Sequence, residues 1–195
     1  MKDFANLLPA IRSNVRFRRL CAWVWSVGRV DRRYMERVLL PAFASISPER
    51  VLSVGTRFYC AHYGEHFCNG KSEYWTMDVD PRAGRDYGSP GRHIIGSVLD
   101  AAQHFKSIEF DLILLNGVLG WGVDLPRDQR EALASLRKVS RLGSILLIGW
   151  DVGHIATEVL SIAEANGFKH GGVLGLPHRT DFRGSKHVYD LFHAV

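Results

Sequence analysis

The segment Val51-Leu52-Ser53-Val54-Gly55-Thr56-Arg57 decides the fold, because it is a short apolar run that stops abruptly at a glycine. Such a run, followed by a helical pattern, is typical of a buried parallel strand whose carboxyl end delivers backbone to a ligand. A second apolar run ends in Asp78-Val79-Asp80-Pro81. Carboxylates at this edge of a doubly wound sheet can bind the two hydroxyls of a ribose. The sequence therefore predicts a site for a cofactor that contains adenosine.

Strand and helix patterns alternate from residue 50 to residue 165, which predicts a parallel sheet covered by helices on both faces. The tail predicts a hairpin made of residues 171–176 and 187–192. A loop rich in glycine and proline is expected from residue 81 to 91. Strands are expected at 50–54, 73–78, 93–95, 110–116 and 144–150, and helices at 59–69, 98–105, 127–140 and 155–165.

The first 48 residues form a basic stretch ahead of this alternating pattern. Apolar residues recur there at spacings of three and four, which predicts helices, with Asp31 as an N-cap. The formal charge of the chain is +5, and the first fifty residues hold nine arginines and one lysine against four acidic residues. We therefore expect a basic helical extension over residues 1–48, a turn at Ser47-Pro48-Glu49, and an α/β domain over residues 49–195.

The arginines of this extension allow two interpretations. They form either a solvated face or a surface for an anionic partner, which would be RNA or an anionic membrane surface. The chain has no apolar run long enough to span a bilayer and no signal-peptide layout at its amino terminus. Its three cysteines are an odd number and argue against a disulfide framework. We expect a cytoplasmic protein, peripheral to a membrane only if these helices bind one.

The order of these segments resembles the class I S-adenosylmethionine-dependent methyltransferases. The resemblance covers roughly residues 49–195, and it includes Gly96-Ser97-Val98, Phe110-Asp111-Leu112-Ile113 and the closing run Val188-Tyr189-Asp190-Leu191-Phe192. It implies a Rossmann-like sheet of seven mostly parallel strands, with the last strand antiparallel between the fifth and sixth and helices on both faces. It also implies S-adenosylmethionine as the cofactor and methyl transfer as the reaction.

The resemblance further implies roles for residues at the strand ends. Gly55 would meet the methionine end of the cofactor, Asp78 the ribose, and Ser97 and Val98 the adenine, while Asn116 would lie beside the reactive methyl group. The full set of cofactor-binding residues that it implies is Ser53, Gly55, Thr56, Asp78, Val79, Asp80, Ser97, Val98, Asn116 and Gly117.

Two positions depart from the family pattern. Bulky residues, Thr56-Arg57-Phe58-Tyr59, follow Gly55 where relatives have further glycines, and bulky side chains limit close backbone approach to a ligand. Ser97 stands where many relatives have an acid. A single glycine after the first strand also argues against a nicotinamide dinucleotide, whose pyrophosphate requires a Gly-x-Gly-x-x-Gly turn.

Methyl transfer requires mainly that the acceptor be positioned and that a proton be removed from it. The loops after the fourth and fifth strands supply Asp124 and His154 as candidate bases, and Trp121 and Trp150 as candidate walls of the acceptor pocket. Asp151 is more simply interpreted as a helix cap. The spacing of Cys60, His62, His66 and Cys68 fits a zinc site poorly, so no metal is expected.

The function expected from these residues is an S-adenosylmethionine-dependent methyltransferase with a small-molecule acceptor. The first alternative is a binding or adaptor protein that keeps this fold without the reaction and uses its arginine-rich helices to bind RNA or a membrane surface. Arg57 or Phe58 filling the methionine subsite would favour it. The second is a nucleic-acid methyltransferase, although the chain lacks an Asn-Pro-Pro-Tyr type motif after the fourth strand.

Overall fold

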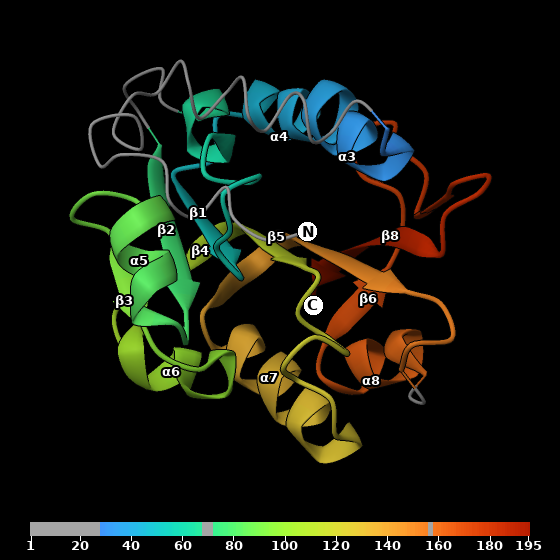
Figure 1. The fold of residues 1–195 in the computed structure, drawn as a ribbon. Helices are drawn as coiled ribbons and strands as arrows, with labels where there is room; N and C mark the ends of the chain where they lie inside the picture. The colour runs from blue at the N-terminus through green and yellow to red at the C-terminus, as the bar shows by residue number, and fades with distance from the viewer. Residues whose placement is uncertain (1–27, 68–71, 156–157) are drawn as a thin grey trace.

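A mostly parallel β-sheet forms the centre of the computed structural model, which describes residues 28–67, 72–155 and 158–195 (Figure 1). Its order is β3-β2-β1-β4-β5-β8-β6, with β1 to β5 parallel to one another and β8 antiparallel between β5 and β6. This arrangement confirms the predicted Rossmann-like class. The strands are Arg50–Val54 (β1), Glu73–Asp78 (β2), His93–Ile95 (β3), Phe110–Asn116 (β4), Ser140–Asp151 (β5), Phe168–His170 (β6), Arg179–Asp181 (β7) and His187–Ala194 (β8).

The sheet has eight strands rather than the seven expected, because two short strands, β6 and β7, pair with different parts of β8. The predicted hairpin is wrong in its first half. Residues 171–176 form no strand and contain only an isolated bridge between Val173 and Leu176. Leu174 and Gly175 both have positive φ angles, 54° and 76°, and this left-handed backbone turns the chain instead of extending it.

Helices cover both faces of the sheet, as predicted (Figure 1). On one face α3 (Val30–Tyr34), a π-helical turn (Met35–Leu39) and α4 (Leu40–Ser45) follow one another. They bury Met35, Leu39 and Phe43 in the same apolar core as Leu112 and Leu147 of the sheet. On the other face lie α6 (Ala101–His104), α7 (Pro126–Lys138) and α8 (Val159–Ala165), which close a second core.

The helix predicted at 59–69 is wrong over the residues described there. The chain makes tight turns and a single 3-10 helix, Tyr63–His66. The backbone bonds in this stretch span three residues, as from Cys60 N–H to Arg57 O (3.1 Å) and from Tyr63 N–H to Cys60 O (3.0 Å). The Cys60 sulfur also accepts the Arg57 amide at 3.1 Å, which holds the first turn closed before an α-helix can begin.

The loop predicted between Pro81 and Gly91 is also wrong, because its first half is the helix α5 (Pro81–Tyr87). Asp80 is the N-cap, and its side chain accepts the Arg82 amide at 2.9 Å. Pro81 stands at the start of the helix, where its missing N–H costs nothing. Asp80 and Pro81, which suggest a loop, therefore mark the start of a helix.

Other elements differ from expectation mainly at their ends. Asp31 lies in the first turn of α3 and is not its N-cap, which is Arg29. The segment predicted as one helix at 98–105 is a 3-10 turn, Val98–Asp100, followed by α6. The helices predicted before residue 28 lie outside the described residues. No helix in the described ranges is long and apolar enough to cross a membrane.

Candidate functional site

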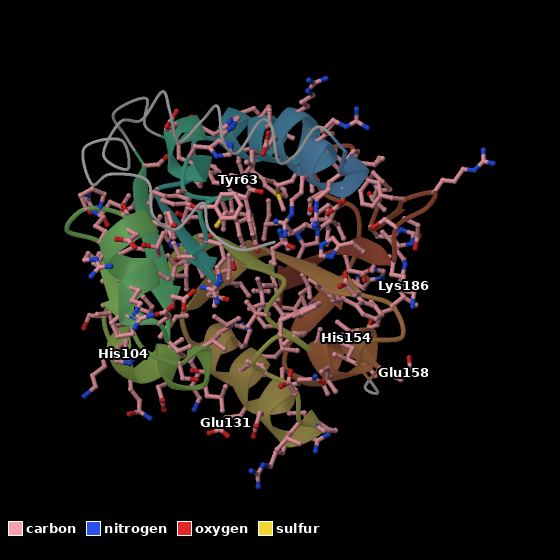
Figure 2. All side chains as sticks on the ribbon, viewed as in Figure 1. Tyr63, His104, Glu131, His154, Glu158 and Lys186 are labelled. Atoms are coloured by element: carbon pink, nitrogen blue, oxygen red, sulfur yellow. The ribbon has the colours of Figure 1, made fainter. Side chains whose placement is uncertain are left out.

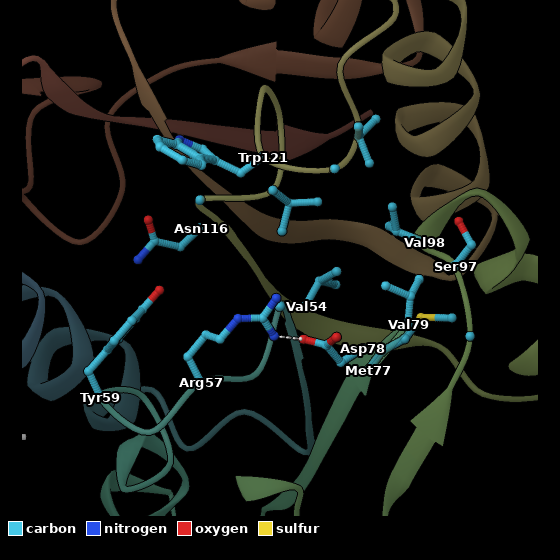
Figure 3. Close-up of a pocket in the computed structure, with 16 residues that line it drawn as sticks. Val54, Arg57, Tyr59, Met77, Asp78, Val79, Ser97, Val98, Asn116 and Trp121 are labelled. Carbon is cyan, nitrogen blue, oxygen red and sulfur yellow. Dashed lines mark hydrogen bonds and ion pairs between the residues drawn. The ribbon is translucent and has the colours of Figure 1, made fainter. Parts of the chain in front are cut away.

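A pocket of about 110 Å³ opens at the carboxyl ends of β1, β2 and β4 and at the turn after β3 (Figure 3). The chain runs outward from β1 to β2 and β3 and then returns to β4 on the other side, so a crevice forms at this reversal of strand order. Its walls are Val54, Gly55, Arg57, Tyr59, Met77, Asp78, Val79, Gly96, Ser97, Val98, Asn116, Gly117, Val118, Trp121, Gly122 and Val123. We call this space the nucleoside pocket.

The Asp78 carboxylate on the wall of the nucleoside pocket is buried and already hydrogen-bonded. Its Oδ2 atom accepts the Thr56 amide at 2.7 Å and the Arg57 guanidinium at 2.6 Å. Its Oδ1 atom accepts the Asp80 amide at 2.8 Å. A carboxylate has about four acceptor sites, so a ligand hydroxyl finds little unused capacity. Arg57 is the replaceable partner, because its side chain is half exposed while the other two donors are backbone (Figure 3).

The turn after β1 is held by a glycine and a thiol. Gly55 has a φ of +83°, and a Cβ atom there would lie 3.0 Å from the side chain of Val118. The buried Cys60 thiol contacts the backbone oxygens of Gly55 (3.6 Å) and Arg57 (3.2 Å). Burial raises the pKa of this thiol, so at neutral pH it remains protonated and acts as a hydrogen-bonding group.

The opposite side of the nucleoside pocket is largely apolar. Val98 is buried, whereas Val79 leaves 65% of its surface exposed. Ser97 accepts the Leu99 amide at 3.2 Å and so caps the 3-10 turn that follows it. This side can contact a flat apolar group, with Ser97 as its polar member.

A second cavity, of about 410 Å³, adjoins the first, and we call it the basic cavity. The two share Arg57, Tyr59, Gly117 and Trp121 as wall residues. The remaining walls of the basic cavity are Arg29, Asp31, Arg32, Asp151, Ser185, Lys186 and His187. They come from α3, from the end of β5 and from the start of β8, so residues far apart in the sequence meet there.

His187 lies on the wall of the basic cavity, and the sequence analysis did not identify it as a functional residue. It stands opposite Asp151 in the β5–β8 ladder, and its Nδ1 atom lies 2.6 Å from Asp151 Oδ1. Its Nε2 atom lies 3.0 Å from Asn116 Oδ1. Burial lowers the pKa of His187, and the hydrogen bond to Asp151 opposes this only in part. The structure places the Asn116 side-chain oxygen against Nε2. A neutral ring protonated at Nδ1 would need the Asn116 amide to turn over and donate from its NH₂ group.

Gly149 explains how Asn116 on β4 reaches His187 on β8, although β5 lies between them. It pairs with Asn116 on one side and with Tyr189 on the other. A Cβ atom at this position would overlap the Asn116 side-chain oxygen and lie 2.9 Å from His187 Nε2. A glycine inside an apolar strand often marks such a close approach. Gly149 is therefore a signal in the sequence that could have indicated this contact.

Most residues predicted to bind the cofactor line the nucleoside pocket, but three do not. Ser53 and Thr56 line a separate cavity of about 220 Å³ beside Cys60, and Thr56 reaches Asp78 only through its backbone amide. Asp80 caps α5. Those on the pocket wall are Gly55, Asp78, Val79, Ser97, Val98, Asn116 and Gly117.

Of the residues predicted to contact the acceptor, Trp121 alone lines a cavity described here, and it lines both. Its indole N–H donates to Asp151 Oδ2 at 3.3 Å, and its ring stacks on His154 at 4.6 Å between centroids. His154 itself contacts the Gly120 carbonyl oxygen at 2.8 Å. Asp124 accepts the Gly122 amide.

Trp150 and Asp151 have other contacts than the sequence analysis expected. The Trp150 indole donates to the buried Asp190 at 2.8 Å and lines neither cavity. Asp151, interpreted from the sequence as a helix cap, instead directs its carboxylate to His187 and Trp121. No group of three or more potential metal ligands occurs within the described ranges.

No protein-family model matches the sequence, and no curated protein matches it. Solved structures do match the fold. The N-methyltransferase NodS from Bradyrhizobium japonicum WM9 has a TM-score of 0.66 at 17% identity, covering 87% of this chain and 98% of that one. Its complex with S-adenosyl-L-homocysteine has a TM-score of 0.64 at 18% identity, covering 95% of each chain.

Two further solved structures extend the comparison. The TehB-like SAM-dependent methyltransferase from Corynebacterium glutamicum has a TM-score of 0.59 at 18% identity, covering 93% of this chain and all of that one. The 16S rRNA methyltransferase RsmC from T. thermophilus has a TM-score of 0.52 at 17% identity, and 35% of that chain is covered. The chain therefore has the fold of the class I S-adenosylmethionine-dependent methyltransferases.

Proposed function

We propose that this protein is an S-adenosylmethionine-dependent methyltransferase that acts on a small-molecule acceptor. The observation that carries the proposal is the nucleoside pocket, whose walls include Gly55, Asp78, Val98 and Asn116 from four successive strand ends of this fold. Two solved neighbours are described as bound to S-adenosyl-L-homocysteine and to AdoMet. When bound, the cofactor would supply an activated methyl group on a sulfonium.

The pocket residues fit this cofactor in three respects. Asp78 is a buried carboxylate at the end of β2, where a ribose can donate to it. Val79 and Val98 offer an apolar surface for a purine. Gly55 turns the backbone in a left-handed conformation beside the same pocket. Arg57 must leave Asp78 for a ribose to bind it fully, and its half-exposed side chain allows this movement.

A small molecule is the acceptor we favour, because the basic cavity shares walls with the nucleoside pocket and has the size of a small-molecule site. Two solved neighbours that this chain spans almost completely are NodS, described as an N-methyltransferase, and the TehB-like protein. The rRNA methyltransferase RsmC is matched over 35% of its length.

We assign proton removal from the acceptor to His187, held by Asp151. His187 lines the basic cavity, and a neutral ring with a proton on Nδ1 has its second nitrogen available as a base once the Asn116 amide moves aside. The roles predicted for Asp124 and His154 have less support, since neither side chain lines either cavity. Trp121 lines both cavities, so its ring would contact the acceptor next to the nucleoside pocket.

Calorimetric titration with S-adenosylhomocysteine tests the proposal. We expect binding in the wild type and a loss of about tenfold or more in Asp78→Asn, because a hydrogen bond to a charged group contributes roughly 1.5–3 kcal/mol. Val79→Trp should also block the pocket, and since Val79 is largely exposed this variant should fold normally. Asp181→Asn, on the exposed edge strand β7, is the matched control.

The alternative is a protein of this fold that has lost the reaction and acts as an adaptor. The ion pair between Arg57 and Asp78 is the observation in its favour, because it occupies the carboxylate that a ribose would need. Absence of binding at millimolar S-adenosylhomocysteine, in the wild type and in Arg57→Gln alike, would support the adaptor and reject the methyltransferase.

A further inference from the structure

We propose that the basic cavity binds the acceptor through an anionic group, a carboxylate or a phosphate, and that Arg57 couples this binding to occupation of the nucleoside pocket. The inference rests on the proposed function, which assigns the nucleoside pocket to the cofactor. It adds the chemical class of the acceptor.

The wall charges of the basic cavity are predominantly positive. Four basic side chains, those of Arg29, Arg32, Arg57 and Lys186, face two acidic ones. Both carboxylates already have donors nearby: Asp151 accepts from His187 and Trp121, and Asp31 lies 3.7 Å from Arg32. The four basic side chains therefore outnumber the two carboxylates, and an anionic ligand would neutralise this excess of positive charge. A cavity lined by one sign of charge concentrates ligands of the opposite sign.

Arg32 is the fixed part of this charge. Its side chain is only 9% exposed, and the guanidinium lies 4.2 Å from the centre of the Tyr59 ring. Burial raises the pKa of Tyr59, of Tyr63 and of Tyr189, so all three phenols stay neutral at neutral pH. The rings around Arg32 therefore do not supply a negative charge. Asp31, 3.7 Å away, compensates part of this buried charge, and an anionic ligand in the basic cavity would compensate more of it.

Lys186 is the exposed part of this charge. It lies on the loop before β8, and Figure 2 labels it on the side of the molecule where Figure 1 labels β6 and β8. Within the residues that the structure describes, Lys186 has no ion-pair partner, and its side chain is exposed. A lysine on a flexible stem can close over an anion that enters the basic cavity.

Arg57 links the two cavities because it lines both, and among the residues that the structure describes its one carboxylate partner is Asp78. A ribose that binds Asp78 replaces the guanidinium, which then remains on the wall of the basic cavity without its counter-charge. Binding in the nucleoside pocket should therefore raise the affinity of the basic cavity for an anion. By thermodynamic linkage, an anion in the basic cavity should raise the affinity of the nucleoside pocket for its ligand by the same factor.

The experiment uses benzoate and phenyl phosphate as anionic probes and benzyl alcohol as a neutral probe of similar size. Each is titrated into the full chain saturated with S-adenosylhomocysteine, and the indole ¹⁵N–¹H signal of Trp121 is followed, after assignment with Trp121→Phe. We expect both anions to bind about tenfold more tightly than the alcohol, or better. A neutral probe that binds as tightly as the anions would overturn the proposal.

Two variants on one loop test whether the positive charge that attracts the anion lies in the basic cavity. Lys186→Gln should weaken benzoate binding about threefold to tenfold, since one surface-exposed charge contact contributes on the order of 1 kcal/mol. Arg183→Gln, three residues earlier and outside the cavity, should leave it unchanged. Equal effects of the two variants would mean that the attraction comes from net charge and not from this cavity.

Arg57→Gln tests the coupling and separates the two proposals. In the wild type, saturation with S-adenosylhomocysteine should tighten benzoate binding severalfold, and in Arg57→Gln that increase should vanish. Benzoate binding that depends on Lys186, without any binding of S-adenosylhomocysteine, would reject the methyltransferase and keep the anion site. S-adenosylhomocysteine binding with no preference for anions would reject the anion site alone.

Discussion

Two glycines of this chain, Gly149 and Gly55, matter because they leave room for contacts between neighbouring residues. Gly149 has no side chain, yet the contact between Asn116 and His187 passes over it. Gly55 similarly allows the turn that brings Arg57 to Asp78. The geometry of the site therefore depends on these small residues as well as on its charged ones.

Gly149→Ala should break the contact between Asn116 and His187. Its Cβ atom would overlap the Asn116 amide, and overpacking of this kind costs about 1–3 kcal/mol of unfolding free energy. Thermal unfolding should show the loss. Gly171→Ala is the control, because a Cβ atom there would meet His193 at an ordinary 3.6 Å. Equal melting temperatures for wild type and Gly149→Ala would contradict the overlap.

His187 should make the fold less stable in mild acid. Burial lowers its pKa below the ordinary value of 6.5, so the unfolded chain binds this proton more readily than the folded chain. Stability should therefore fall as the pH drops from about 6.5 toward the lowered pKa, and the effect should level off below it.

Titration of the His187 ring by NMR, together with urea unfolding at several pH values, measures this effect. His187→Gln should flatten the pH dependence in that window, and His178→Gln, on the exposed loop, should not. A ring pKa above 6.5 in the folded protein would reverse the sign and refute the argument.

At the scale of elements, apolar runs were reliable signals and glycine-rich or mixed stretches were not. β1, β2, β3 and β4 lie where the sequence predicts them, because each contains a short apolar run, and the run is buried almost throughout in β1 and β4. The helix α5 was missed because Pro81, Gly84 and Gly88 are typical of loops. Its cap, Asp80, had instead been assigned to the cofactor.

α5 also allows a test in which helix propensity and packing oppose each other. Alanine normally stabilises a helix interior by about 1 kcal/mol relative to glycine. At Gly84, however, a Cβ atom would overlap the His93 ring, which Thr76 holds through its hydroxyl at 2.9 Å. Gly84→Ala should therefore destabilise the wild type.

The same change should stabilise a His93→Ala background, where the obstructing ring is absent. Chemical denaturation of the four proteins gives the double-mutant cycle. A stabilising Gly84→Ala in the wild-type background would mean that the ring moves aside at no cost.

Considered as a whole, the molecule joins a cavity that the sequence predicts, the nucleoside pocket, to one that it does not, the basic cavity. The nucleoside pocket lies at the carboxyl ends of parallel strands, and parallel strands follow from alternation along the chain. The basic cavity needs α3, the end of β5 and the start of β8 together. No periodic pattern reports which residues meet across an antiparallel insertion, so Asp151 and His187 could not be paired beforehand.

The insertion of β8 between β5 and β6 has a consequence for local unfolding of the protein. Because β8 separates β5 from β6, the short strand β6 joins the sheet only through β8. Detachment of β8 would therefore release β6 and remove His187 from the basic cavity, whereas β1 would keep its pairings with β2 and β4 at the nucleoside pocket.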